Sequence, residues 1–206
     1  LLYDASGEGP APPADAFARL ERQAAAVPPG SDGLIFTPWV NGVHAPSEDH
    51  FTRSAFFNQS LGTTRGHYAR AVMEGIAYNL RWVRPHVERF AGREFTRLNF
   101  IGGGAQSATW CQIFADVLGV EIGQVGDPRY ANARGAALSG FLALGEMRPS
   151  DVRAAVPIEA TYAPDPAATA VHDAHFESFV EIFKRNRRTY RRLNGGAQPV
   201  LERPAR

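Results

Sequence analysis

The sequence is poor in cysteine, in net charge and in long apolar runs. Cys111 is its single cysteine, so no disulfide can form within the chain. The 22 basic and 21 acidic residues leave a net charge of +1, too weak to attract nucleic acid or an anionic membrane surface. No apolar run approaches about 18 residues, the length that crosses a membrane as a helix, and no signal peptide is visible. These absences favour a protein of the reducing cytoplasm that has neither nucleic acid nor a membrane as its partner.

The 206 residues are enough for one large domain, or two small ones, with a sizeable core. Hydrophobic residues make up 44% of the chain and charged residues 21%, which is typical of soluble globular proteins. The first residues, Leu1 to Asp4, include no initiator methionine. We therefore expect the chain to be part of a longer protein.

A glycine-rich stretch at residues 97–119 organises the rest of the sequence. Its pattern predicts a strand at 98–101, a turn at Gly102–Gly104, and a helix at about Ser107–Leu118. Glycines let another group approach the backbone, and a helix start offers unpaired N–H groups with partial positive charge. Such a turn suits a phosphate group or a flat ring. The simpler interpretation is a tight turn without a ligand, and it is not excluded. The sequence lacks the third glycine and the acidic residue of a dinucleotide fingerprint, and it also lacks the Gly-Lys-Ser/Thr of a P-loop.

The segments around this stretch alternate between strand and helix patterns. Strands are expected at 33–38, 55–58 and 120–125, and helices at 11–26, 63–90, 132–144 and 170–193. This alternation predicts an α/β domain with a mixed or parallel sheet.

The helix 63–90 carries the longest amphipathic pattern in the chain. Thr63 or Thr64 is expected to be its N-cap, and His67 to be a packed, hydrogen-bonded histidine. Pro85 lies inside the pattern and is expected to kink or interrupt the helix near Arg81. Proline has no N–H to donate to the carbonyl of Arg81, four residues earlier in the helix.

The helix 132–144 has one face made of small residues. Asn132 is expected as its N-cap and Gly145 as its stop. The face consists of Gly135, Ala136, Ser139, Gly140 and Ala143. Since small side chains let two backbones approach, we expect this face to pack closely against another element.

Two polar clusters are candidates for sites of other kinds. The loop 39–54 carries His44, Glu48, Asp49 and His50, but their spacing fits no metal-ligand pattern, and a solvated loop is the favoured interpretation. The last helix is rich in arginine near its end. A helix C-terminus stabilised by cations explains these arginines better than a nucleic-acid site.

Four segments resemble, in sequence order, parts of the FGGY family of carbohydrate kinases. Residues 32–46 resemble its segment of a strand, a proline and an Asn-Gly loop, and residues 53–78 resemble its second signature. Residues 100–119 resemble its adenosine-binding element, and residues 134–145 its closing Gly-Ala-Ala helix. The order and spacing agree over about residues 20–193, and among family members the chain is most similar to the xylulose kinases.

The chain departs from the family pattern at a few positions. Asn58 and Gln59 stand where the signature usually has a glycine and an aliphatic residue, and Tyr68 replaces an aliphatic residue. Tyr130 stands where the family usually has an acid. These departures leave the sugar subclass open and suggest that Tyr130 and Asn132 mark a divergent edge of an ATP site.

The resemblance implies an actin/Hsp70-like, ribonuclease H-like ATPase domain, an α/β fold in which helices flank a mixed sheet. Family members have two such domains facing a cleft: the first binds the sugar and supplies an aspartate base, and the second binds ATP. This chain matches the second. Residues 1–30 are expected to be a partial N-terminal segment of that domain, 31–147 its core, and 148–206 its C-terminal loop, helix and tail. The family's Gly-Thr-Ser phosphate hairpin is expected before Leu1.

The implied reaction is transfer of the γ-phosphate of ATP to a sugar hydroxyl, with ATP and Mg²⁺ as cofactors. The resemblance assigns the nucleotide to Gly103, Gly104 and Ala105, which offer flat backbone to the adenine and α-phosphate, and to Ser107, which caps the helix. Asp116 could be taken for a base, but it lies near the far end of that helix from the glycines. No catalytic residue and no metal ligand is therefore expected on this chain. The isolated chain is therefore expected to be inactive.

Two alternatives stay open beside a xylulose kinase. One is a non-catalytic nucleotide-binding scaffold of the same superfold. The other is a kinase for another sugar or polyol, such as ribulose, gluconate or glycerol. In both kinase cases the sugar is expected to bind mainly to the other domain, and analogy with the family suggests a homodimer.

Overall fold

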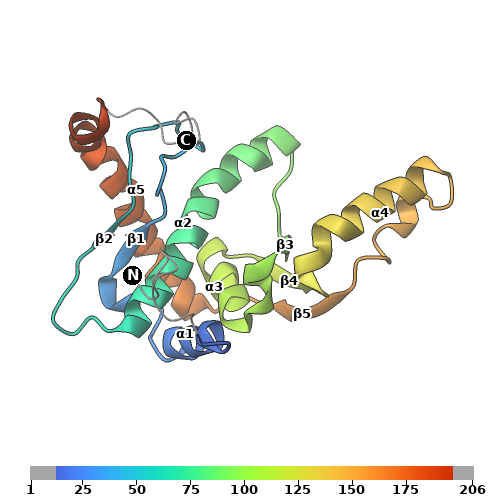
Figure 1. Cartoon of the computed structure of the whole chain (residues 1–206), viewed down its shortest axis with the longest axis horizontal. Coiled ribbons are helices and arrows are strands. Elements are labelled where there is room, and N and C mark those ends of the chain that lie inside the picture. The colour runs from blue at the N-terminus through green and yellow to red at the C-terminus, as the bar shows by residue number, and fades with distance from the viewer. Residues whose placement is uncertain (1–12, 197–206) are drawn as a thin grey trace.

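The computed structural model describes residues 13–196, which form five α-helices and five strands joined by loops and 3₁₀ turns (Figure 1). The helices are α1 (Ala16–Ala25), α2 (Arg65–Ala91), α3 (Ala108–Leu118), α4 (Ala131–Ala143) and α5 (Pro166–Asn194). The strands are β1 (Ile35–Thr37), β2 (Ala55–Phe57), β3 (Arg97–Phe100), β4 (Glu121–Val125) and β5 (Ile158–Tyr162). The expected alternation of helices and strands is confirmed, and β5 is an additional strand. Residues 11 and 12 of the first expected helix, and residues 197–206 of the expected tail, lie outside the described part.

The strands form two small sheets. β1 pairs antiparallel with β2, and the other sheet has the order β3-β4-β5. β3 and β4 run parallel, with Leu98 opposite Ile122, whereas β4 and β5 run antiparallel, with Ile122 opposite Tyr162. This sheet is therefore mixed, as expected. Because α3 connects two parallel strands, the carboxyl ends of β3 and β4 lie at the same edge of the sheet.

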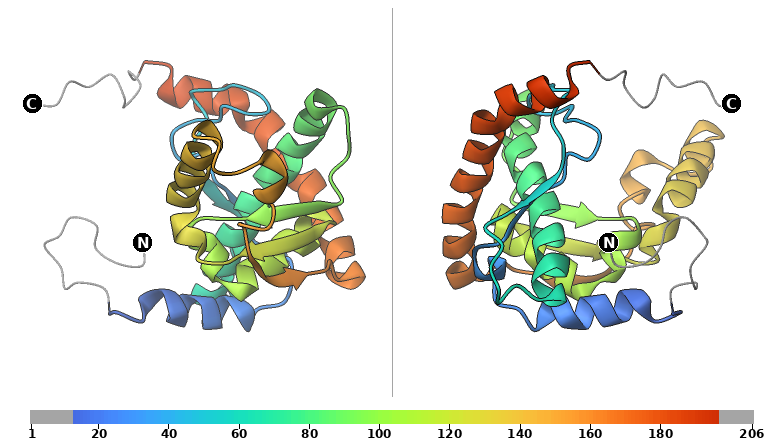
Figure 2. Two further views of the ribbon diagram at one scale, coloured as in Figure 1. Left: turned by 90° about the vertical axis from the view of Figure 1, so that its right-hand side faces the viewer. Right: turned by 60° about the vertical axis from the view of Figure 1, so that its left-hand side comes forward.

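The core lies between α2, α3 and α5 and the three-stranded sheet. In both views of Figure 2, α2 and α5 lie on one side of this sheet and α4 extends from the other. An aromatic cluster joins α2 and α5 to the segment after β1: the ring of Trp39 lies 5.0 Å from Phe179 and 5.1 Å from Phe183, and Trp82 lies 4.9 Å from Phe183. Aromatic pairs at these separations add to the stabilisation from burial.

A buried ion pair fastens the loop after α1 to α2. Nε of Arg70 lies 2.7 Å from Oε1 of Glu74, one turn further along the helix. Nη1 of Arg70 donates to the carbonyl of Val27 at 3.0 Å, and Glu74 accepts from the N–H of Gly30 at 2.9 Å and the hydroxyl of Ser31 at 2.8 Å. These bonds satisfy both buried charges, which would be costly if left unpaired. They hold α1 at the side of α2.

Both ends of α2 agree with the sequence to within about two residues, but the expected interruption inside the helix does not. Thr64 and His67 form a reciprocal capping box, and Nε2 of His67 lies 2.9 Å from a carboxylate oxygen of Asp32. His67 is therefore a packed, hydrogen-bonded histidine, as predicted. Of the kink or interruption expected near Arg81, the interruption is wrong, because α2 continues through Pro85 to Ala91. Pro85 is exposed, so water can replace the missing hydrogen bond.

The expected packing of α4 is also wrong. The helix contains no buried residue, and it extends away from the rest of the described structure (Figure 1). A Cβ added at Gly135 or Gly140 would have no described atom within 4 Å, so the small face has no neighbour here. The N-cap position is Tyr130 and not Asn132, whereas Gly145 takes the left-handed conformation after the helix, as expected of a stop.

None of the helices in the described residues combines the length and apolar character needed to span a membrane.

Candidate functional site

The glycine turn connects the end of β3 to the start of α3. Gly102 has φ 89° and ψ −174°, a region of backbone space that is essentially open to glycine alone. Its N–H donates to the carbonyl of Pro128 at 2.8 Å, which ties the turn to the segment that follows β4. Ligands of α/β sheets bind outside the carboxyl ends of parallel strands. The turn and residues 126–132 together form such an edge.

The open part of this turn is Gly102 and Gly103. A Cβ added at either glycine would have no described atom within 4 Å, so their backbone faces open space. A Cβ at Gly104 would lie 2.8 Å from the ring of Trp110 and 3.2 Å from that of Phe100. Gly104 is therefore required by the protein's own packing, because the ring of Trp110 lies where its Cβ would be.

Ala105 fixes the turn from its buried side. It is fully buried, and its N–H donates to the carbonyl of Gly102 at 3.2 Å. Its own carbonyl accepts from Nε2 of Gln124 at 2.6 Å and from the thiol of Cys111 at 3.7 Å. The backbone N–H and carbonyl of Ala105 are therefore both hydrogen-bonded within the protein. Ala105 shapes the turn, and Gly102 and Gly103 form its exposed surface.

Ser107 caps α3, as predicted, but it also has a partner that the sequence did not indicate. Its Oγ accepts from the N–H of Trp110 at 3.0 Å and donates to Oε1 of Glu21 on α1 at 2.6 Å. The same carboxylate oxygen lies 3.4 Å from the N–H of Thr109. Glu21 thus places a negative charge at the positive end of α3, where we expected a phosphate. It lies 86 residues from Ser107, so no local pattern marks it.

The start of α4 supplies the positive groups of this edge. Among the described residues no side chain caps its N-terminus, and the N–H of its first residue, Ala131, donates to the carbonyl of Pro128 in the 3₁₀ turn that precedes it. The positive end of the helix dipole favours an anion at this position. The guanidinium of Arg134 donates to the carbonyl of Gly126 at 2.8 Å, while its Nη1 is buried with no partner in the described structure. Arg129 lies over the exposed ring of Tyr130 at 5.7 Å. This edge therefore combines open backbone, positive charge and an exposed aromatic ring.

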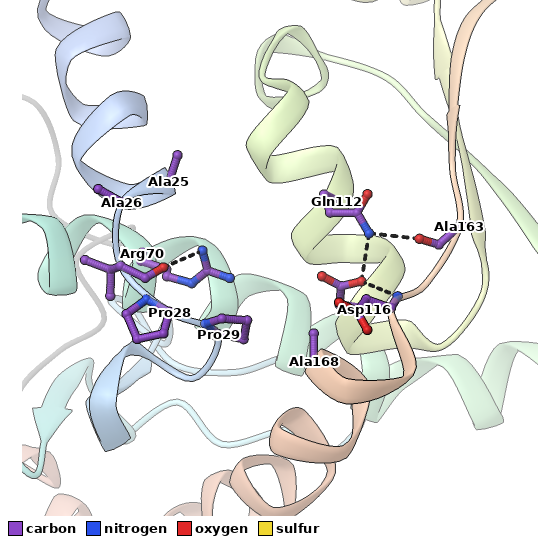
Figure 3. A pocket seen from close by; sticks show the side chains of 11 residues that line it. Ala25, Ala26, Pro28, Pro29, Arg70, Gln112, Asp116, Ala163 and Ala168 are labelled. Carbon is purple, nitrogen blue, oxygen red and sulfur yellow. Dashed lines mark hydrogen bonds between the residues drawn. The ribbon is translucent and has the colours of Figure 1, made fainter.

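A separate cavity of about 680 Å³ lies between the loop after α1, α3 and the start of α5 (Figure 3). Asp116, which the sequence offered as a weak candidate for a base, lines it. Its Oδ1 accepts from Nε2 of Gln112 and from the N–H of Asp165, both at 2.8 Å, and its carbonyl accepts from the hydroxyl of Thr169 at 3.0 Å. Burial raises the pKa of the Asp116 carboxyl, against the effect of these donors. Asp116 therefore joins α3 to α5.

The loop residues that we did not expect to bind metal are partly brought together. His44, Glu48 and His50 place ligand atoms within 4.8 Å of one another. Asp49 is buried and faces the other way, toward Arg187 on α5.

Comparison with known proteins identifies the family. Residues 4–144 match the C-terminal domain of the FGGY family of carbohydrate kinases. The xylulose kinase of Staphylococcus epidermidis is 30% identical over 175 residues, which cover 84% of this chain and 35% of that protein. The gluconokinase of Bacillus subtilis is 32% identical over 133 residues, which cover 65% of this chain and 26% of that protein.

A solved structure of the same family also matches the fold. The crystal structure of gluconate kinase from Lactobacillus acidophilus superposes with a TM-score of 0.73 at 26% identity, covering 94% of this chain and 37% of that one. The chain spans about a third of the length of the proteins it matches. The expected actin/Hsp70-like α/β domain is confirmed. The chain belongs to the FGGY family of carbohydrate kinases and corresponds to its C-terminal domain.

Proposed function

We propose that this chain is the ATP-binding half of a carbohydrate kinase that transfers the γ-phosphate of ATP to a sugar hydroxyl. The open backbone of Gly102 and Gly103, at the common edge of β3 and β4, is the observation that carries the proposal. The match to a kinase family supplies the reaction.

In this proposal the adenosine lies on the glycine turn. Gly103 offers backbone without side-chain obstruction, Gly104 and Ala105 fix the shape of the turn, and Ser107 fixes the start of α3. The phosphate groups lie toward the start of α4, which has no side-chain cap, and not toward α3, because Glu21 already occupies the start of α3 and would repel an anion. Mg²⁺ bound to the phosphates of ATP would supply charge neutralisation there.

The sugar and the base that accepts its proton belong to the rest of the longer protein in this proposal. Xylulose is the first choice of substrate, since a xylulose kinase aligns with 84% of the chain. Gluconate is the alternative, because a gluconokinase is of similar identity and a gluconate kinase superposes well. The described residues near the glycine turn bind and orient the nucleotide. We therefore expect the chain alone to bind ATP without transferring phosphate to D-xylulose or D-gluconate.

The test is ATP binding to the chain, measured by isothermal titration calorimetry, in wild type and Gly103→Trp. The site around Gly103 is open and its φ is not positive, so the new ring has room and the fold is retained. It covers the proposed adenine surface, and we expect affinity to fall at least about tenfold, or about 1.4 kcal/mol. Gly140→Trp, at an equally open glycine in the distal half of α4, is the matched control and should bind as wild type does.

Equal ATP affinity in wild type and Gly103→Trp would contradict the assigned surface. A coupled assay for ADP on the same samples separates binding from chemistry. ATP binding without sugar-dependent ADP agrees with the proposal, whereas sugar-dependent ADP from the chain alone would show that the catalytic groups lie within it.

A further inference from the structure

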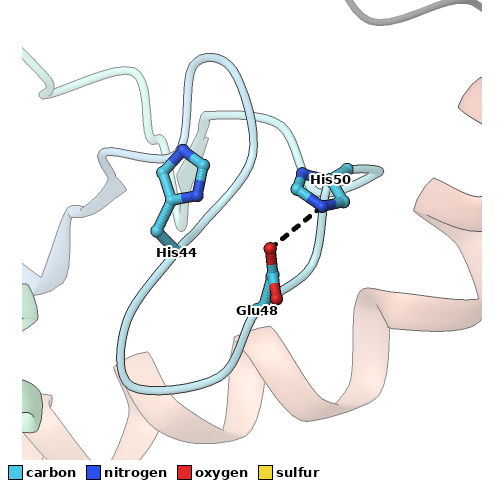
Figure 4. Close-up of side chains that lie close together, drawn as sticks. All are labelled: His44, Glu48 and His50. Carbon is cyan, nitrogen blue, oxygen red and sulfur yellow. Dashed lines mark ion pairs between the residues drawn. The ribbon is translucent and has the colours of Figure 1, made fainter.

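We propose that the loop between β1 and β2 holds a site for a divalent transition-metal ion of the zinc type, formed by His44, Glu48 and His50. These three exposed side chains come from one short loop, and their ligand atoms lie within 4.8 Å of one another (Figure 4). Nε2 of His50 lies 3.1 Å from Oε1 of Glu48. The rings of His44 and His50 have centroids 5.9 Å apart. This site is separate from the glycine turn and independent of the proposed kinase function.

The backbone explains why these three side chains share a face. Val43 and Asp49 form an antiparallel bridge in which each N–H donates to the other carbonyl, at 3.0 and 2.8 Å. Both residues of this pair are buried, so their side chains face the protein. Side chains alternate between the two faces of extended backbone. The neighbours of the pair, His44 on one side and Glu48 and His50 on the other, consequently face outward.

The loop is also held in place. Oδ1 of Asp49 accepts from the N–H of Phe51 at 2.9 Å and of Thr52 at 3.2 Å, and Oδ2 accepts from Nε of Arg187 on α5 at 3.0 Å. Gly42 has φ +86°, and a Cβ there would lie 2.9 Å from the carbonyl oxygen of Asp49 and 3.0 Å from Cα of His50. The chain therefore passes closely over Gly42, and the positions from which Glu48 and His50 project are fixed before any ion arrives.

The separation of the side chains suits a small ion after rotation of side chains alone. A tetrahedral Zn²⁺ with bonds of about 2.0–2.2 Å to nitrogen and oxygen has ligand atoms about 3.4 Å apart. The pair formed by His50 and Glu48 is already that close, and His44 completes the set by a small rotation. On binding, the contact between Nε2 of His50 and Glu48 is exchanged for coordination, and the fourth position is left to water.

The ligand types decide which ion is bound. Imidazole nitrogens suit Zn²⁺, Co²⁺, Ni²⁺ and Cu²⁺, whereas Mg²⁺ and Ca²⁺ require a shell of oxygen ligands. One carboxylate and two imidazoles therefore select against the Mg²⁺ that accompanies ATP. All three ligands belong to the loop between β1 and β2, so the ion cross-links two parts of this one loop. The cross-link lies beside Asp49, which fixes the loop to α5.

The experiment titrates ZnCl₂ into metal-free, tag-free protein in a calorimeter. We expect one ion per chain in wild type, and at least a tenfold loss of affinity in both His44→Ala and His50→Ala. His86→Ala removes an exposed histidine of α2 outside the cluster and should bind zinc as wild type does. Zinc at a hundredfold excess over its dissociation constant should raise the melting temperature by about 5–10 °C in wild type and in His86→Ala.

Three results would overturn the site. The first is zinc affinity in His50→Ala and His44→Ala equal to that of wild type, since the variants are exposed substitutions that keep the fold. The second is loss of binding in His86→Ala. The third is MgCl₂ competing with zinc at similar concentrations, which would indicate unspecific attraction to the carboxylate. Glu48→Gln should lower the affinity by a smaller factor than either histidine variant, because it removes the charge and keeps the shape.

Discussion

The hydroxyl of Ser107 donates a 2.6 Å hydrogen bond to Oε1 of Glu21, and this contact joins α1 to the first turn of α3. The negative charge of the carboxylate is stabilised by the positive end of α3, as the charge of a bound phosphate would be. The start of α4 is left as the helix end without a side-chain cap beside the glycine turn. The contact between Ser107 and Glu21 thus places a carboxylate at the start of α3, which is why the proposed function has the phosphates toward α4.

Replacing Glu21 should destabilise the domain. Glu21→Ala removes the acceptor for Ser107 and the charge at the start of α3, and we expect the free energy of unfolding to fall by about 1–2 kcal/mol. Urea denaturation followed by circular dichroism measures this. Glu177→Ala, at an exposed position of α5, is the control and should stay within about 0.5 kcal/mol of wild type. A loss in Glu21→Ala no larger than in the control would show that the contact contributes nothing.

The two neighbouring glycines of the turn should respond differently to the same substitution. Gly104→Ala forces a methyl group to within 2.8 Å of Trp110, so we expect a loss of about 1–3 kcal/mol from overpacking. Gly103→Ala meets open space at an ordinary φ and should change the stability by less than about 0.5 kcal/mol. Chemical denaturation of both variants provides the comparison. Equal losses would mean that the ring of Trp110 yields to the new methyl group.

The buried His172 should make stability depend on pH. Burial, with a further contribution from the charge of Arg70, lowers its pKa to about 4 in the folded protein, against about 6.5 when unfolded. Since the unfolded state binds the proton more tightly, the stabilising contribution is complete above about pH 6.5 and is lost as the pH falls toward 4. Between pH 7 and 4.5 this loss amounts to about 2 kcal/mol.

His172→Gln provides the comparison for this prediction. Glutamine does not titrate, and its side-chain oxygen can accept the hydrogen bond that the hydroxyl of Tyr78 makes with Nδ1 of His172. Carboxylates titrate alike in wild type and in this variant, so the difference between their unfolding free energies isolates the histidine. That difference should shrink as the pH falls from 7 to 4.5. A difference that stays constant over this range would contradict the lowered pKa.

Local patterns in the sequence predict much of this fold. α3 and β4 begin and end within about a residue of their expected positions, because hydrophobic periodicity and the flanking glycines define them. The capping role of Ser107 and the packed state of His67 also follow from short-range spacing. The capping contacts of Ser107 with Trp110 and of His67 with Thr64 join residues within one helical turn of each other.

The features that the sequence does not predict depend on contacts between distant segments. Glu21 lies on another helix than Ser107, and only the folded structure brings them together. Which glycines of the turn are covered is decided by the position of the Trp110 ring, which lies against Gly104 and leaves Gly102 and Gly103 open. Likewise, His44 and His50 meet only because Val43 pairs with Asp49. In each case the missing information is a tertiary contact.

The exposure of α4 has a consequence for how the domain unfolds. An isolated helix of 13 residues is marginal in water, and α4 gains no support from buried side chains in the described structure. Its main tether is the bond from Arg134 to Gly126 at its first turn. The distal turns can therefore open and close while the aromatic core stays intact, as a cooperative unit of their own with a low free energy of opening. The main transition in a melting curve of this chain accordingly reports the unfolding of the core, and the opening of α4 contributes little to it.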